Sequence, residues 1–194
     1  MLNPIDTEAV IRRGGAIGRF PGEIHEGVAW WLGACLVVTQ KADRIAVAHD
    51  GHPSITEFAK RFCLGAINAQ HYACNVRFLG LQTEEPLLVT LGSFDGVPGA
   101  WLSASETEGT LVVRITLYNR QGLVLDDTNG LAEIRRLIAE DRVPIPVNAR
   151  AKGIIEPWHP PSAKREDPSW STRPRSSGPA PAMPTSTWGG RYPS

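Results

Sequence analysis

The chain has 194 residues, of which 42% are hydrophobic and 21% charged, a balance typical of a globular protein with one ordinary domain. Basic and acidic residues number 20 each, so no net charge favours nucleic acid or an anionic membrane as a partner. No apolar run approaches the roughly 18 residues that span a bilayer, and the start of the chain lacks signal-peptide order. Three cysteines without a C-x-x-C spacing argue against a disulfide framework or a zinc site, and favour the reducing cytoplasm.

The first 150 residues alternate helical and strand patterns. Helices are expected over about 21–38, 54–70, 84–92 and 129–140, and strands over about 44–48, 75–79, 99–103 and 110–118. Ser54, with Glu57 three residues later, has the pattern of a helix-capping box.

Strands that alternate with crossover helices predict an α/β fold, a three-layer α/β/α sandwich with a mixed, mostly parallel sheet. The strand at 110–118 follows its predecessor after a short loop, so we expect an antiparallel pair at an edge of the sheet. The glycine-rich segment 14–18 resembles a loose loop, but no strand pattern precedes it, so it does not qualify as a nucleotide-binding loop.

Composition changes sharply near Trp158, after which Pro, Ser, Gly, Thr and Ala dominate. Such a segment cannot bury enough apolar area to offset its backbone entropy. We therefore predict a folded domain over residues 1–150 and a disordered C-terminal tail over 151–194. Its tryptophans are either incidental or short anchors for a partner.

Several stretches carry motifs: residues 45–60 (IAVAHDGHPSITEFAK), 79–83 (LGLQT), 99–105 (GAWLSAS) and 117–134, preceded by 11–14 (IRRG). In this order and spacing they resemble the first domain of the phosphoglucomutase/phosphomannomutase family, the α-D-phosphohexomutases. Residues 11–14 correspond to the family's D-I-R-G element, and 45–60 to a strand with its D-G-R turn and the following helix. Residues 79–83 correspond to the L-G-x-x-x-T segment, and 99–105 to the strand entering the T-A-S-H-N-P active-site loop. Residues 117–134 correspond to the last strand, turn and helix of that domain.

The resemblance implies a chemistry that the family performs with four domains. A phosphorylated serine on the first domain's loop exchanges its phosphoryl group with the sugar. Mg²⁺ is held by that phosphoserine and by a D-x-D-x-D-R loop of the second domain. Ser105 matches the phosphoserine, Asp50 the aspartate of D-G-R and Arg13 the arginine of D-I-R-G, whereas His52 stands where D-G-R has its arginine.

The sequence departs from the family at the residues that handle phosphate. Glu106 and Glu108 stand within the family's His-Asn-Pro stretch, and each carboxylate would repel a close phosphate by about 1 kcal/mol. His52 cannot replace the bidentate contact of an arginine. No D-x-D-x-D-R stretch occurs, so we expect no cofactor, with Mg²⁺ only if Ser105 is phosphorylated. Any remaining anion site is expected where the loops after residues 48 and 104 meet, with Arg13 and His52 adding positive charge.

The resulting hypothesis is a stand-alone, catalytically degenerate domain of carbohydrate metabolism that binds a sugar phosphate, another anion or a protein. Two alternatives stay open: a phosphohexomutase fragment that uses Ser105 in trans with other domains, and a structural module whose tail recruits partners. The expected partners are a second copy or a complete phosphohexomutase, joined through the strand at 110–118 or the adjacent helical face. Neither nucleic acid nor a membrane is expected.

Overall fold

The fold is known from a computed structural model, which describes residues 5–69, 72–93, 96–144 and 149–157. These residues belong to one compact unit, Met1–Pro160. The helical segments are α1 (Thr7–Val10), α2 (Glu26–Thr39), α3 (Pro53–Ile67), α4 (Glu84–Ser93), α5 (Leu131–Ala139) and the short 3₁₀ turn η1 (Ala149–Ala151). The strands are β1 (Ile11–Arg12), β2 (Gly15–Phe20), β3 (Arg44–His49), β4 (Asn75–Leu81), β5 (Gly99–Thr107), β6 (Thr110–Tyr118) and β7 (Ile155–Pro157).

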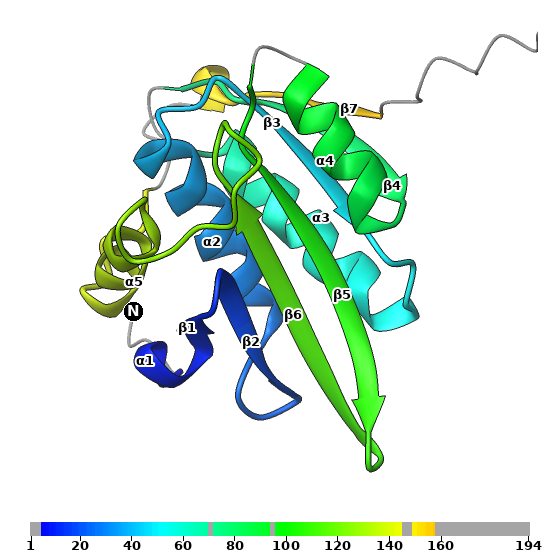
Figure 1. Cartoon of the computed structure of the whole chain (residues 1–194). Helices are drawn as coiled ribbons and strands as arrows, with labels where there is room; N and C mark the ends of the chain where they lie inside the picture. Colours follow the sequence, from blue (N-terminus) through cyan, green and yellow to red (C-terminus); the bar gives the residue numbers. More distant parts are fainter. Residues whose placement is uncertain (1–4, 70–71, 94–95, 145–148, 158–194) are drawn as a thin grey trace, which may run out of the picture. The chain divides into compact units, whose positions relative to one another are not determined.

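The strands form one sheet in the order β1-β2-β6-β5-β3-β4-β7 (Figure 1). β3 pairs in parallel with β4 and β5, and β7 extends that group in parallel with β4. β6 runs antiparallel to both β5 and β2, and β1 antiparallel to β2. β2, β3, β4, β5 and β7 therefore point one way, which confirms the predicted mixed, mostly parallel sheet.

Helices cover the two faces of the sheet unequally. α2, α3 and α5 bury a large apolar cluster against one face, with Val113, Ile115 and Leu117 of β6 in it. α4 packs on the other face over a smaller cluster that includes Ala46, Ala48 and Leu91. The three-layer α/β/α arrangement is thus confirmed, but its second helical layer consists, in the described residues, of α4 alone.

Two glycines allow α2 and α3 to approach closely. A Cβ atom at Gly33 would lie 2.2 Å from the carbonyl oxygen of Phe62, and one at Gly65 would lie 2.0 Å from that of Trp30. Each position would therefore clash with the backbone of the opposite helix if it carried a side chain. This contact fixes the helical layer behind β3 and β5, the strands that lead to the candidate site.

Three local predictions were wrong. β6 is not an edge strand, because β2 pairs with it from Gly15 to Phe20. The segment interpreted as a glycine-rich loop is most of that β2 strand. The N-cap of α3 is His52 rather than Ser54, since the His52 Nδ1 accepts from the Ser54 backbone N–H and Pro53 opens the helix.

The ordered chain continues past residue 150. β7 pairs with β4 through the register Val76↔Ile155 to Phe78↔Pro157, and the Gly153 N–H donates to the Ile67 carbonyl oxygen at 2.9 Å. The predicted boundary at 150 therefore falls inside the folded part of the chain. The remainder of the predicted tail, 158–194, lies outside the described residues.

Candidate functional site

The loop after β3 contacts the later part of β5 through Asp50. Its Oδ2 accepts a hydrogen bond from the Ala104 backbone N–H at 2.7 Å, and its Oδ1 accepts from the His52 backbone N–H at 2.9 Å. The Asp50 N–H itself donates to the Leu102 carbonyl oxygen at 3.0 Å. Sequence reasoning expected a loop after residue 104 here, but the chain continues as β5 to Thr107, and it missed that the Asp50 carboxylate accepts from this strand.

The two histidines that flank Asp50 both accept a hydrogen bond from a nearby backbone N–H. His49 Nδ1 accepts from the Gly51 N–H at 3.1 Å, and the nearly buried ring stacks on Phe78 at a centroid distance of 5.6 Å. Burial lowers the pKa of His49, against a smaller opposing effect of Asp50. His52 uses its Nδ1 to cap α3. In each ring one nitrogen therefore accepts a backbone hydrogen bond, so fewer ring atoms remain to contact a ligand.

Ser105 lies within a strand, not on a loop. β5 and β6 pair without interruption from Gly99↔Tyr118 to Thr107↔Thr110, and Ser105 is opposite Val112. The connection is the tight turn at Glu108 and Gly109, both with positive φ. The Ser105 side chain is exposed, as are Glu106 and Glu108. The long active-site loop implied by the family resemblance is here a short β-hairpin with two glutamates near its tip.

Arg13 lies away from this group. It occupies the tight β1–β2 turn with φ of 52°, followed by Gly14 at 91°. Across the strands, the neighbouring Arg12 pairs with Gly15, Gly15 with Thr116, and Thr116 with Trp101. Arg12 and Trp101 therefore have the same position along the strand direction. Ser105 is four residues farther along β5, about 14 Å at the usual rise per residue. The expected assembly of Arg13 with His52, Asp50 and Ser105 is therefore not formed, because Arg13 lies in the β1–β2 turn and the strands β2 and β6 separate β1 from β5.

The donor set at this end does not suit Mg²⁺. Octahedral Mg²⁺ takes oxygen ligands, with one or two carboxylates typical of protein sites. Both Asp50 oxygens already accept backbone hydrogen bonds. Within the described ranges no group of three or more His, Cys, Asp or Glu side chains could hold a metal ion.

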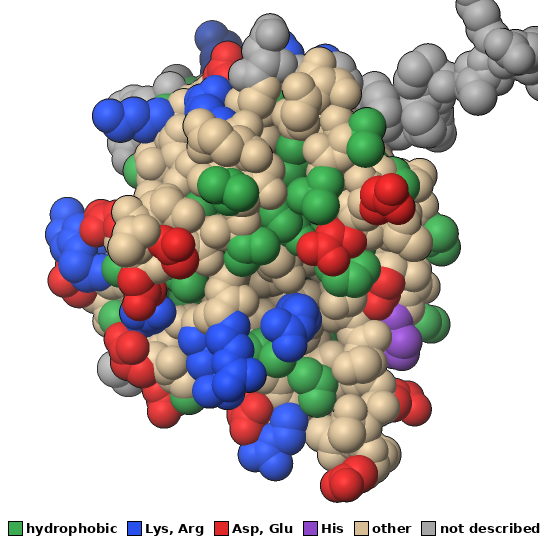
Figure 2. All heavy atoms as spheres, in the orientation of Figure 1, with side chains coloured by type: hydrophobic (Ala, Val, Ile, Leu, Met, Phe, Trp, Pro, Cys, Tyr) green, Lys and Arg blue, Asp and Glu red, His purple; other side chains and the backbone are tan. Residues whose placement is uncertain are grey.

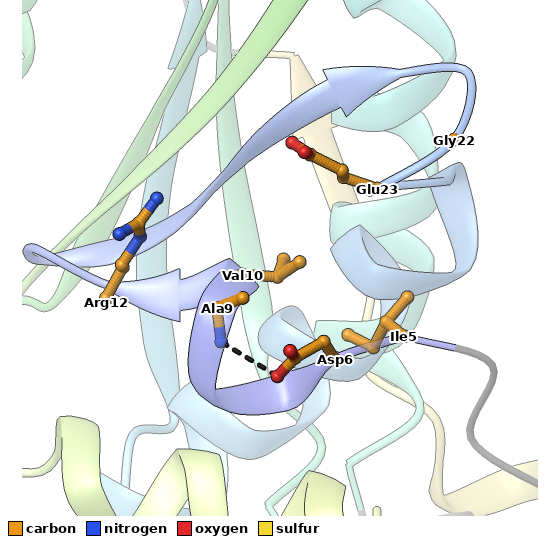
Figure 3. Close-up of a pocket in the computed structure, with 7 residues that line it drawn as sticks. All are labelled: Ile5, Asp6, Ala9, Val10, Arg12, Gly22 and Glu23. Atoms are coloured by element: carbon orange, nitrogen blue, oxygen red, sulfur yellow. Dashed lines mark hydrogen bonds between the residues drawn. The ribbon is translucent and has the colours of Figure 1, made fainter.

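A pocket of about 290 Å³ opens at the β1 edge of the sheet, a site that sequence reasoning did not anticipate (Figure 3). It is lined by Ile5, Asp6, Ala9, Val10, Arg12, Gly22 and Glu23. Asp6 Oδ1 accepts from the Ala9 N–H at 3.0 Å, as the N-cap of α1. Both Glu23 oxygens bind Arg19, through its backbone N–H and its Nε. The carboxylates of this pocket thus mainly hold the surrounding turns.

None of the helices in the described part of the chain is both long and apolar enough to cross a membrane.

Comparison with known proteins adds a structural likeness. No protein-family model matches the chain, and no curated protein matches its sequence. The chain is similar to the solved structure of a phosphoglucomutase/phosphomannomutase family protein from Burkholderia thailandensis, with a TM-score of 0.58 and 16% sequence identity. The match covers 79% of this chain and 33% of that chain, so this chain corresponds to about a third of the solved protein. At this identity the likeness shows a shared fold, as the sequence motifs led us to expect.

Proposed function

We propose that this chain is a catalytically degenerate domain of the phosphohexomutase type that acts by binding a protein partner. The observation that carries the proposal is the unbroken β5–β6 ladder through Ser105. A phosphoacceptor must approach its donor in line and at close range, which favours a serine on an open loop. In this chain the equivalent segment is a paired strand that ends in a two-residue turn.

The electrostatics around Ser105 support the same proposal. Glu106 and Glu108 are exposed in the hairpin, and each would oppose a phosphate by about 1 kcal/mol at close, screened range. Arg13 lies in the β1–β2 turn, with β2 and β6 between β1 and β5, and the nearer Arg19 is paired with Glu23 at 2.7 Å. The site thus offers a phosphate little of the charge neutralisation that phosphoryl transfer requires.

A protein partner suits this surface better than a free sugar phosphate does. At the carboxyl ends, both Asp50 carboxylate oxygens and the His52 Nδ1 accept backbone hydrogen bonds. The fold likeness makes a complete phosphohexomutase a suitable partner to test, which would place the chain in carbohydrate metabolism. A protein surface can use shape and backbone edges that a small anion cannot.

Phosphoryl acceptance separates this proposal from the alternative of an active fragment. The full chain is incubated with a hexose 1,6-bisphosphate and Mg²⁺, and intact mass is followed by peptide mapping. We expect no added phosphate. Phosphate on Ser105 that disappears in Ser105→Ala and persists in Ser103→Ala, a control two residues earlier on β5, would refute the proposal.

Partner binding is tested by mixing the purified chain with a complete phosphohexomutase and measuring association by sedimentation. A complex is expected. No association at any salt concentration would remove this partner, whereas binding of glucose 1-phosphate at the Asp50 loop, seen by amide NMR shifts, would favour the sugar-phosphate ligand instead.

A further inference from the structure

On the α4 side of the sheet, no helix of the described residues covers β2, most of β6 and the end of β5. Tyr118 and Trp101 lie under or beside α4 in the smaller apolar cluster. Alternation along β6 and β5 then puts Val112, Arg114, Thr116 and Ser103 on the same side of the sheet. On β2 the same side carries Ile17, which is paired with Arg114. We call this area over β2, β6 and the end of β5 the open half-face.

The open half-face combines partly buried apolar side chains with arginines, of which Arg114 forms no ion pair within the described ranges. Ile17 and Val112 are each partly exposed. Arg19 lies opposite Val112 on the same side and is paired with Glu23, whose carboxylate also interacts electrostatically with Arg12. Arg114 has no such carboxylate partner among the described residues. Figure 2 shows the blue side chains gathered over the lower part of β2 and β6, with green side chains between them and α4. An apolar surface with uncompensated positive charge is suited to an apolar segment with a carboxylate.

The outer side of α4 has the complementary character. Leu88 and Val89 are 37% and 65% exposed, although the helix buries Leu87 and Leu91 against the sheet. Glu85 precedes Leu88 by three residues and Val89 by four, so its exposed carboxylate is on the same outer side of the helix. Tyr118 donates to the Glu84 side chain, which anchors the first turn of α4 on the sheet and presents this outer side in a fixed orientation.

We propose that two copies of this chain pair face to face, with the outer side of α4 of one copy on the open half-face of the other. The outer side of α4 and the open half-face are on the same side of the sheet. In a dimer with a two-fold axis, α4 of each copy can therefore pack on the open half-face of the other. Such an isologous contact closes as a dimer and makes every interaction twice. Glu85 of one copy faces the Arg114 region of the other, and Leu88 and Val89 cover Ile17 and Val112.

Charge reversal tests this arrangement on the full chain by sedimentation equilibrium. Unmodified protein is expected to dimerise at micromolar concentration. Arg114→Glu and Glu85→Arg should each raise the dimer Kd at least about 10-fold, since each disrupts two close charge pairs. The double variant restores both pairs with reversed sign, and its Kd should return to within about 3-fold of the original. Lys60→Glu, on α3 behind the opposite face, is the matched control and should leave Kd unchanged.

Val89→Asp provides a variant that does not depend on the partly buried Arg114. Its side chain is mostly exposed, so the fold should be unaffected while the dimer is lost. Far-UV circular dichroism and the urea midpoint verify the fold of each variant. A monomer at all concentrations up to about 100 μM, or a double variant as weak as the single ones, would overturn the proposal.

Discussion

Replacing Asp50 by alanine removes the acceptor that joins the loop after β3 to strand β5. The carboxylate accepts from Ala104 at 2.7 Å and from His52 at 2.9 Å. A hydrogen bond with a charged partner contributes about 1.5–3 kcal/mol, so two of them sum to about 3–6 kcal/mol. Because Asp50 is only half-buried, water replaces part of this loss, and we expect the free energy of unfolding to fall by about 3 kcal/mol.

Urea unfolding followed by far-UV circular dichroism measures this loss, with the dependence on urea concentration expected to stay unchanged. Asp50→Asn should have an intermediate effect on stability. Its amide oxygen can accept one of the two hydrogen bonds, but its NH₂ group is a donor and cannot accept from the other backbone N–H. Asp43→Ala removes an exposed carboxylate just before β3 and should change stability by less than about 0.5 kcal/mol.

The reasoning would be refuted by an Asp50→Ala variant that loses no more stability than Asp43→Ala does. Hydrogen exchange of the Ala104 amide gives an independent measurement, since its protection should decrease more in Asp50→Ala than that of strand amides in β4. Equal protection in the variant and the parent protein would mean that other contacts hold the loops together.

Three further predictions concern stability and reactivity. In urea unfolding, Gly65→Ala should lower the free energy of unfolding by about 1–3 kcal/mol. Gly92→Ala lies in open space on α4 and should raise it by up to about 1 kcal/mol. Equal effects of the two variants would contradict the close contact between α2 and α3. Burial raises the pKa of each cysteine thiol to about 12, so a thiol reagent should label none of them in the native protein and all of them in urea; these are Cys35, Cys63 and Cys74. Since the pKa of His49 is lowered in the fold, the unfolded chain takes up this proton first as the pH falls through about 6.5, and stability declines there. In His49→Gln the slope of unfolding free energy against pH should be shallower, and an unchanged slope would exclude His49 as its source.

The repeating helix and strand patterns were sufficient to predict the centre of the fold. β3, β4 and β6 are runs rich in aliphatic residues, and the expected strand at 110–118 matches β6 at both ends. β2 was missed because Gly15 and Gly18 interrupt its alternation, although both glycines face close neighbours in the fold. β7 was missed because its three exposed residues carry no burial pattern. The pairing of β2 with β6 is a long-range contact that no local pattern encodes, and it explains why the predicted edge was wrong.

The candidate site was predictable only in part. Two loops that follow parallel strands must emerge at the same end of a sheet, so the meeting of Asp50 with the end of β5 followed from strand order. The position of Arg13 depends on the direction in which β2 joins the sheet, and family resemblance alone assigned it to the site. The replacement of a loop by a hairpin at Ser105 is indicated by Gly109, a suitable residue for a tight turn, but the sequence was interpreted there through the family motif.

The late position of β7 in the chain has a consequence for biosynthesis. Domains begin to fold while translation proceeds from the N-terminus. Until residues 155–157 have left the ribosome, β4 presents an unpaired backbone edge next to Val76 and Phe78, and exposed edges of this kind invite pairing with other chains. A nascent chain that has emerged from the ribosome only to about residue 150 would be nearly folded and yet prone to association, whereas emergence of a few more residues would cover the edge of β4.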